Sequence, residues 1–492
     1  MEASREEGQG YPAYRSLWVW LLLGWVVAYV DRTITGPVIS YMIDNDLAFV
    51  ADAVNPYALG GLIGSMFFAG YILTQFPGGY LGDRFGHRTI IVISLFWAGI
   101  ATLLSGLMTG LIVFVAFRVI TGLGEGTFYS NDRTVITQQT PFEKRGLGMG
   151  IAIAGLPIGL TLALIFTVPM IGLGESVLGA GNGWRMPFFI SGVITLVVGF
   201  GVLRFFRGQR GEYEFRPAFL PALRDLGKYS LVFLAAVMAI FLAADWVSLP
   251  EWAVAVLITL VAMSLVGFAF GRKGGEVGPV LYNRNLILIY ISAIAILWNL
   301  WFFGFWSVSI VSQAAGQGSL LYAGLTAAFN TGAGILGFPA GGWLADYAKR
   351  KGWGRKWMLV SFSLIAGLLT IIFGLYIING GQSLFVMGIL LFFQATFFFA
   401  LQPISMALTA DIVTNPALLG AAFGMWNLVG EIGAVLSPAV SGVLRGATGD
   451  WNTAVMLDAG ILLASAVLLL FVRESRTASD DKQQPSEVEA TS

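Results

Sequence analysis

The sequence predicts an all-α polytopic membrane protein built from two six-helix bundles, with two further helices inserted between them. Of its 492 residues, 57% are hydrophobic and only 11% are charged, whereas a soluble domain is typically about 25% charged. About fourteen stretches of ~20 mostly apolar residues follow one another, each long enough to cross a bilayer. The last six stretches also repeat features of the first six.

The predicted elements follow in order along the chain. Residues 1–16 form a polar cytoplasmic tail, and residues 17–205 form the N-terminal bundle, with helices expected at 17–42, 56–81, 89–108, 110–138, 147–172 and 186–205. The inter-bundle region, 206–285, contains two extra spans at about 229–247 and 251–270. The C-terminal bundle, 286–472, has helices expected at 286–312, 321–345, 357–378, 384–410, 418–444 and 454–472. Residues 473–492 are polar and are expected to form a disordered cytoplasmic tail.

The distribution of basic residues predicts the orientation. Cytoplasmic loops of membrane proteins carry an excess of Lys and Arg. If both termini are cytoplasmic, only Arg185 and Arg445 of the 28 basic residues fall in outside loops, and only Arg32, Arg118 and Arg133 fall within spans. The sequence therefore predicts a multi-pass protein of the cell (inner or plasma) membrane with both termini inside.

Composition argues against several other classes of protein. The net charge is zero, so no nucleic-acid footprint is present. There is no Cys and a single His, His87, so neither a disulfide nor a histidine-based zinc site is expected. No GxxxxGK[ST] phosphate loop is found, so nothing indicates direct use of ATP.

The two halves resemble each other in sequence. GYLGD at 79–83 ends the second span of the first half, and GWLAD at 342–346 ends the second span of the last six. MGIAIAGLPIG (149–159) likewise corresponds to FGMWNLVGEIG (423–433). Two similar units in the same orientation are typical of transporters that rock two bundles about a central site.

Specific motifs extend this interpretation to a family. GYLGDRFGHR (79–88) resembles the signature loop of the major facilitator superfamily, and FRVITGLGEG (117–126) resembles its fourth-span pattern. With AYVDR (28–32) and YILTQFPGGYLGDRFG (71–86), these motifs resemble the anion:cation symporter family. There are two departures: members of that family generally have twelve spans, and Glu431 stands where a second Asn is expected.

The resemblance implies a secondary active transporter, not an enzyme. It would move a small organic anion, a carboxylate or sugar acid, with protons across the bilayer by alternating access. The proton gradient would be its driving force, with no cofactor and no metal, and it would work as a monomer. Two alternatives stay open at this point. One is a fourteen-span drug:proton antiporter, although GLPIG (155–159) lacks the Gly-Pro pair usual in the fifth span of such proteins. The other is an anion exchanger without proton coupling.

Charges within the spans are the candidate functional groups, because a charge at mid-membrane costs roughly 2.5–3.5 kcal/mol on insertion scales. Asp31 lies ~21 Å from the inner end of its span, and Arg118 lies ~12 Å from the outer end of its span. Because the two distances are measured from opposite faces of a ~30 Å core, both residues lie at about the same depth. Asp31 or Arg32 is therefore expected to face Arg118. Arg118 and Glu125 share one helix face, and Gly122 between them leaves room for a ligand or a neighbouring helix.

The chemistry of these groups suggests a division of roles. An Arg fork suits a carboxylate, whereas a carboxyl group can bind and release a proton as its surroundings change. The resemblance implies the same division: Asp31 and Glu125 would couple to protons, and Arg32 and Arg118 would contact the anion. Glu431 is a further candidate for coupling. The competing interpretation is a buried ion-pair network that only holds the first and fourth spans together.

Polar side chains in the spans are candidates for the substrate site. They are Tyr29, Tyr71 and Gln75 by family position, with Asn299, Asn330, Gln394 and Asn427 in the second half. Each could equally hydrogen-bond a neighbouring helix. The signature-loop residues Gly79, Asp83, Arg84, Gly86 and Arg88, together with Asp346, are expected to control an inner gate. His87 is expected to face solvent at the inner surface.

Overall fold

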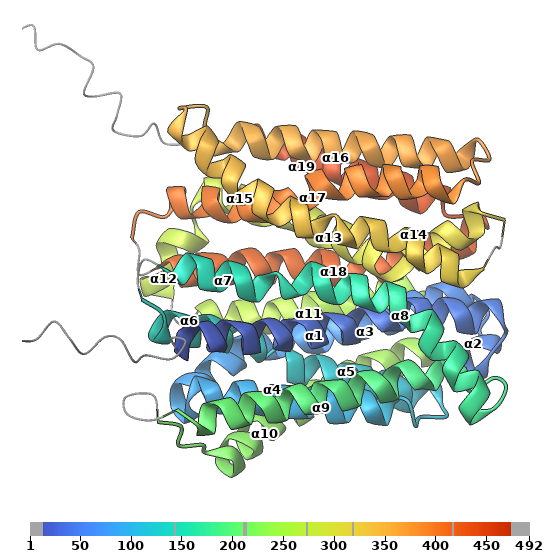
Figure 1. The fold of residues 1–492 in the computed structure, drawn as a ribbon, viewed down its shortest axis with the longest axis horizontal. Helices are drawn as coiled ribbons and strands as arrows, with labels where there is room; N and C mark the ends of the chain where they lie inside the picture. The colour runs from blue at the N-terminus through green and yellow to red at the C-terminus, as the bar shows by residue number, and fades with distance from the viewer. Residues whose placement is uncertain are drawn as a thin grey trace, which may run out of the picture.

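The computed structural model describes residues 13–141, 144–209, 214–271, 274–316, 319–415 and 418–473, and the regular elements in this part are helices (Figure 1). The prediction of an all-α polytopic fold is confirmed: thirteen helical segments here are long and apolar enough to cross a membrane. The one predicted span outside these thirteen is the second inserted span, 251–270, whose described apolar stretch, Glu251–Leu265, is shorter. Residues 1–12 and 474–492 of the predicted tails lie outside the described residues.

The first half of the chain forms ten helices in the described residues. They are α1 (Ala13–Asp44), α2 (Ala48–Ala51), α3 (Pro56–Phe85), α4 (His87–Ser105), α5 (Leu111–Glu125), α6 (Phe128–Gln139), α7 (Arg145–Ile153), α8 (Gly155–Leu178), the 3₁₀ helix η2 (Gly183–Arg185) and α9 (Met186–Arg207). The predicted fourth span is thus two helices, α5 and α6, and the predicted fifth is α7 and α8. The first of these breaks falls at Gly126, where a side chain would collide with the backbone of Tyr71 on α3.

The rest of the chain follows the predicted order. The inserted region forms α10 (Phe219–Trp246), α11 (Glu251–Gly271) and the short α12 (Gly274–Leu281). The second half forms α13 (Arg284–Ala314), α14 (Leu320–Gly332), α15 (Gly334–Arg350), α16 (Arg355–Ile378), α17 (Leu384–Ile412), α18 (Leu419–Thr448) and α19 (Asn452–Leu469). The span predicted at 321–345 is interrupted at Ala333, between α14 and α15.

The helices run roughly along one direction and pack within each half and between the halves (Figure 1). In the first half α1 packs on α8, α3 on α5 and α4 on α9; in the second half α16 packs on α19 and α15 on α17. The halves meet where α3 contacts α18, α8 contacts α14 and α1 contacts α13. Of the inserted helices, α10 contacts α3, α4 and α5, while α11 contacts both α3 and α18.

Glycines bring the backbones of the two halves together at the end of the molecule away from the termini. A side chain on Gly61 of α3 would collide with the carbonyl of Pro438 on α18, and one on Gly442 would collide with the carbonyl of Tyr57. Trp306 on α13 donates its indole N–H to the same Pro438 carbonyl at 3.0 Å. The halves are therefore closely packed at this end.

Candidate functional site

The adjacent charges of α1 find different partners on α5. Arg32 Nε lies 2.6 Å from Glu125 Oε2, and both side chains are almost fully buried. Asp31 Oδ1 lies 3.6 Å from Arg118 Nη1, and both of these side chains are buried too. The depth estimate, which places Asp31 or Arg32 against Arg118, agrees with this geometry for Asp31. Two ion pairs, rather than one, thus join the first and fourth spans.

Aromatic rings surround the Arg32 guanidinium. Its Cζ lies 4.3 Å from the centroid of Tyr71 and 4.7 Å from that of Tyr29. The rings of Phe67 and Trp25 are each 5.7 Å away. These distances lie within the ~6 Å range of cation–π attraction. Arg32 Nη2 has no hydrogen-bond partner among the described residues, so part of its donor fork is unused.

Arg32 lies where the two halves of the chain meet. Tyr29 stacks on Trp301 of α13, with ring centroids 6.0 Å apart and an interplanar angle of 13°. Gln75 Oε1 accepts a 3.0 Å hydrogen bond from Asn427 Nδ2 of α18. Glu431, also on α18, is buried, interacts electrostatically with Arg32 and has no hydrogen-bond partner for Oε2 among the described residues. A cation and two carboxyl groups therefore converge between the halves.

Arg118 lies inside the first bundle instead. Its Nη2 donates to Ser105 Oγ on α4 at 2.9 Å and to Thr121 Oγ1 on α5 at 3.1 Å. Its guanidinium lies 5.0 Å from the ring of Phe188 on α9. These contacts tie α1, α4, α5 and α9 together, which favours the structural interpretation for the Asp31–Arg118 pair.

Gly122 has a packing role. A side chain there would collide with the carbonyl of Phe67 on α3. Of the two uses expected for the space at Gly122, a ligand or a neighbouring helix, the structure shows the neighbouring helix. The close crossing of α5 and α3 also places Gly122 beside the backbone of Tyr71, whose ring lies against the Arg32 guanidinium.

Asn299 belongs to a chain of buried polar groups within the second half. It donates through Nδ2 to Asp458 Oδ2 on α19 at 2.5 Å and accepts from Gln394 Nε2 at 3.3 Å. Gln394 in turn accepts from Asn330 Nδ2 at 3.1 Å. Each of these amides was expected either to bond a neighbouring helix or to contact substrate. The structure shows bonds to neighbouring helices, so we assign none of these hydrogen-bonded groups to the substrate.

Two buried acids escaped the sequence analysis. Asp458 sits within the predicted span 454–472, and Asp132 sits within the predicted span 110–138. Asp132 Oδ2 accepts from Trp25 Nε1 at 2.7 Å, and Asp132 Oδ1 lies 3.7 Å from Arg133 Nε. An acid inside a predicted span is the signal that would have found both.

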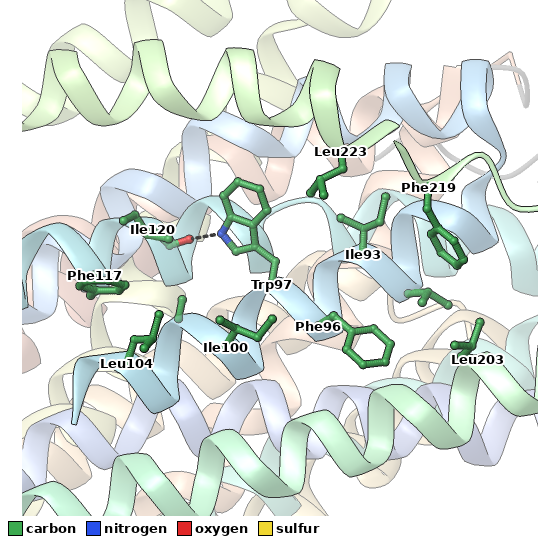
Figure 2. Close-up of a pocket in the computed structure, with 12 residues that line it drawn as sticks. Ile93, Phe96, Trp97, Ile100, Leu104, Phe117, Ile120, Leu203, Phe219 and Leu223 are labelled. Carbon is green, nitrogen blue, oxygen red and sulfur yellow. Dashed lines mark hydrogen bonds between the residues drawn. The ribbon is translucent and has the colours of Figure 1, made fainter. Parts of the chain in front are cut away.

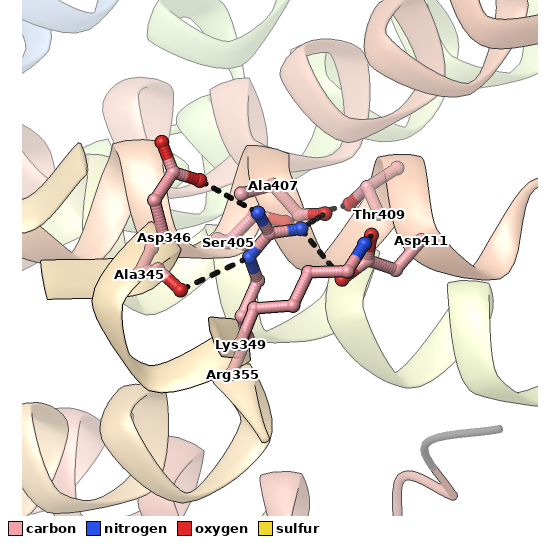
Figure 3. Close-up of polar contacts among 8 residues, drawn as sticks. All are labelled: Ala345, Asp346, Lys349, Arg355, Ser405, Ala407, Thr409 and Asp411. Atoms are coloured by element: carbon pink, nitrogen blue, oxygen red, sulfur yellow. Dashed lines mark hydrogen bonds and ion pairs between the residues drawn. The ribbon is translucent and has the colours of Figure 1, made fainter. Parts of the chain in front are cut away.

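Asp346, which the sequence predicts as part of an inner gate, belongs to a compact charge cluster in the second half (Figure 3). The guanidinium of Arg355, the first residue of α16, lies between two carboxylates: Nη2 is 2.7 Å from Asp346 Oδ1, and Nη1 is 2.6 Å from Asp411 Oδ2. Lys349 Nζ lies 2.5 Å from Asp411 Oδ1. The cluster joins the ends of α15, α16 and α17 on the side of the termini.

The signature loop of the first half is bonded differently. Gly86 has φ = +92°, a backbone conformation that favours glycine, and it is the N-cap residue between α3 and α4. Asp83 lies 3.3 Å from His87 Nε2, whereas Arg84 reaches Asp225 of the inserted helix α10 at 2.9 Å. Gly79 faces Ser130, and the guanidinium of Arg88 lies 5.8 Å from the ring of Phe206.

His87 is not the solvent-facing residue that was expected. Its side chain is only 12% exposed, and Nδ1 lies 2.8 Å from Asn131 Oδ1. Asn131 in turn donates to the Gly78 carbonyl at 2.9 Å. Because α6 packs against α3 and α4 here, the imidazole fills the space between them.

Comparison with known proteins agrees with the fold. The chain matches the model of the Major Facilitator Superfamily over residues 21–324 and 308–491. It is 26% identical to the "D-galactonate transporter" of Escherichia coli O6:H1 over 417 residues, covering 84% of this chain and 86% of the relative. It is 26% identical over 476 residues to the "Probable sulfoacetate transporter SauU" of Cupriavidus necator, covering 95% and 96%.

A solved structure shows the same fold at lower sequence identity. A bacterial homolog of the human lysosomal transporter Spinster, in an inward-facing and occupied conformation, superposes with a TM-score of 0.69. It is 17% identical in sequence, and the match covers 97% of this chain and 100% of that chain.

Proposed function

The chain belongs to the major facilitator superfamily, and on this premise we propose that it is a secondary active transporter that moves a small organic anion together with protons by alternating access. The observation that carries the proposal is the buried Arg32–Glu125 pair at the meeting of the two halves. The two relatives compared above are named as transporters of D-galactonate and sulfoacetate, which are both organic anions. A carboxylate or sugar acid is the substrate class that we propose.

The anion would bind at Arg32. Its Nη2 is unpaired among the described residues and points a donor into a buried, low-dielectric place. Charge-assisted hydrogen bonds from a guanidinium fork to a carboxylate are short and specific. The rings of Tyr29 and Tyr71 hold the guanidinium, so its donors stay aimed while the substrate exchanges.

Protons would couple to transport through competition for Arg32. An ionised Glu125 occupies Arg32 Nε and opposes a second negative charge nearby. When Glu125 takes up a proton, its hold on the guanidinium weakens and the substrate carboxylate can take its place. Substrate and proton would then bind together, and the loss of either would favour loss of the other.

Glu431 would link this chemistry to the movement of the halves. It approaches Arg32 from α18, on the opposite half from Glu125. The rocking of one half against the other would change its distance from Arg32. In the arrangement described here, α3 and α18 are packed at the end away from the termini, which the basic residues predict to be the outer end. Opening at that end would complete the transport cycle.

One alternative rests on the same ion pair and differs only in whether that pair titrates. Glu125 and Arg32 are already close enough to form a hydrogen-bonded ion pair. If that pair never titrates, the protein would be an anion exchanger without proton coupling. The drug:proton antiporter has less support, because a buried guanidinium between the halves suits an anion better than a cationic drug.

Ligand binding can test the substrate class directly. We would measure the thermal unfolding temperature of the purified protein with D-galactonate, sulfoacetate and a panel of other organic acids, each at several pH values. A ligand that binds the folded state raises this temperature according to its concentration relative to Kd. Stabilisation by an acid but not by its amide or neutral sugar analogue, and stronger at low pH, is expected. Stabilisation only by cationic amphiphiles would overturn the proposal.

A further inference from the structure

An apolar groove of about 450 Å³ lies on the surface of the first bundle (Figure 2). It lies between α4, α5, α9 and the inserted helix α10. Phe219 and Leu203 lie at one end, Phe117 and Leu104 at the other, and Trp97 lies between them (Figure 2). This volume is within the ~300–1,000 Å³ range of small-molecule sites.

The lining excludes a polar occupant. None of the side chains that form the groove is charged. The one indole N–H among them, that of Trp97, is already used by a 2.8 Å hydrogen bond to the Ile120 carbonyl. Ile100 and Leu223 are half exposed on its walls. Because these helices are membrane spans, the groove opens toward hydrocarbon, and a hydrocarbon chain is the occupant it suits.

The length of the groove matches one leaflet. On α4 its lining extends from Val92 to Leu104, which is ~18 Å at 1.5 Å per residue. Half of a ~30 Å hydrocarbon core is ~15 Å. The Phe219 and Leu203 end adjoins the α9–α10 connection, on the side of the termini. An acyl chain entering there would lie along the groove to about the middle of the bilayer.

Basic residues lie beside this part of the lining in the sequence, on α9 and on the first turns of α10. Arg204 follows the lining residue Leu203, and Arg224 follows the lining residue Leu223. Arg207 lies one turn beyond Leu203 on α9. All three are exposed, and none is in an ion pair with another residue of the described part. Their positive charge complements a phosphate.

We propose that this groove binds an anionic phospholipid from the leaflet on the side of the termini, with an acyl chain between α4 and α10 and the phosphate at Arg204 and Arg224. Phe219 and Leu223 of α10 form one wall, so the groove depends on the inserted helix. The Arg84–Asp225 ion pair fixes the same part of α10 to the signature loop on α3. A bound lipid would thus brace the inserted helix against the first bundle.

Native mass spectrometry tests this proposal on the full-length protein. The protein is reconstituted with equal amounts of phosphatidylglycerol and phosphatidylcholine of the same acyl chains, then extracted in mild detergent. The wild type should retain phosphatidylglycerol preferentially. Arg204→Gln and Arg224→Gln should each weaken that retention about fivefold, which corresponds to ~1 kcal/mol per basic residue. Arg350→Gln, at an exposed residue on α15, is the control and should change nothing.

Filling the groove tests the acyl chain separately. Ile100→Trp should lower retention of both lipids, whereas Val197→Trp, at an exposed residue of α9 outside the groove, should not. If the Ile100 variant does not fold, brominated phosphatidylglycerol gives a second readout, because it should quench wild-type fluorescence more than that of Trp97→Phe. Equal retention of the two lipids by the wild type, or equal retention by the Ile100 and Val197 variants, would overturn the proposal.

Discussion

Arg32 Nε lies 2.6 Å from Glu125 Oε2, with 2% and 3% of the two side chains exposed, at the place where the two halves of the chain meet. Removing one partner of a buried pair typically costs ~3–5 kcal/mol, because the other charge is left without compensation. Any step that separates Arg32 from Glu125 therefore needs a replacement, either a proton on the acid or an anion on the guanidinium. This requirement is the physical basis of the proposed coupling.

Glu125→Gln removes the titrating group and keeps the shape. We expect exchange of labelled substrate across the membrane to persist and pH-driven accumulation to be lost, because Gln cannot carry the proton. Uptake and counterflow in liposomes measure the two activities. Glu175→Gln is the control. It changes an acid near the C-terminal end of α8, outside the site, and should retain both activities. Accumulation by the Glu125 variant at the wild-type level would remove Glu125 from the coupling mechanism.

Arg32→Lys keeps the positive charge but removes the planar fork of guanidinium N–H donors. A hydrogen bond to a charged group contributes ~1.5–3 kcal/mol, so the Kd for an anionic substrate should rise about tenfold or more. Isothermal titration with the stabilising acid measures this change. Arg284→Lys, at an exposed residue that starts α13 outside the site, is the control and should leave Kd unchanged. An unaltered Kd in the Arg32 variant would mean that Arg32 is structural.

Arg118→Lys should affect stability more than binding. The shorter ammonium loses two hydrogen bonds from Nη2: the one to Ser105, which joins α5 to α4, and the one to Thr121 within α5. We expect a lower thermal unfolding temperature with the substrate Kd within about twofold of wild type. A stable Arg118 variant with a strongly raised Kd would instead place this residue in the substrate site, as the family resemblance implies.

Gly442→Val tests the close packing of the halves. Its side chain would collide with the carbonyl of Tyr57 on α3, so the closed arrangement at this end should be destabilised. We expect slower transport with little change in Kd, and more labelling of a cysteine introduced at Ala58, which is buried beside Tyr57 in the closed arrangement. Gly424→Val, on the same helix with open space around it, is the matched control. Equal transport rates for the two variants would contradict this role of the α3–α18 crossing.

Asp458→Asn should be tolerated. The carboxyl group is buried and bonded to the amide of Asn299, and none of the ion pairs of the described residues includes it. A neutral side chain of the same shape avoids burying a charge. Thermal unfolding and pH-driven uptake should both stay near the wild-type values. Loss of pH-driven uptake with intact folding would make Asp458 a second coupling group.

The sequence predicts this fold well because span length, the distribution of basic residues and internal repeats can all be identified without knowing how the helices pack. It also predicts the depth match between Asp31 and Arg118, since a helix rises by a fixed ~1.5 Å per residue. It does not predict that Arg32 binds Glu125. That contact depends on the rotation of α1 about its axis and on the close approach of α3 and α5 at Gly122, which are set by tertiary packing.

The remaining differences have similar causes. His87 looks like a surface residue because it follows a charged loop, yet α6 packs over it and Asn131 bonds its ring. The amide of Asn299 looks equally suited to substrate or helix contact, and its use by Asp458 becomes visible only when α13 and α19 are packed together. Pairings between distant helices thus account for most of what the sequence leaves undetermined.

Proton-driven accumulation is the most direct measurement of the proposed function. Liposomes containing the purified wild-type protein would be loaded at neutral pH, diluted into acidic buffer with the labelled acid that stabilises the protein most, and compared with liposomes lacking a pH gradient. We predict accumulation above the external concentration only with the gradient, abolished by a protonophore and by Glu125→Gln. Equilibration to the same level with and without the gradient would contradict proton coupling and identify an exchanger or uniporter.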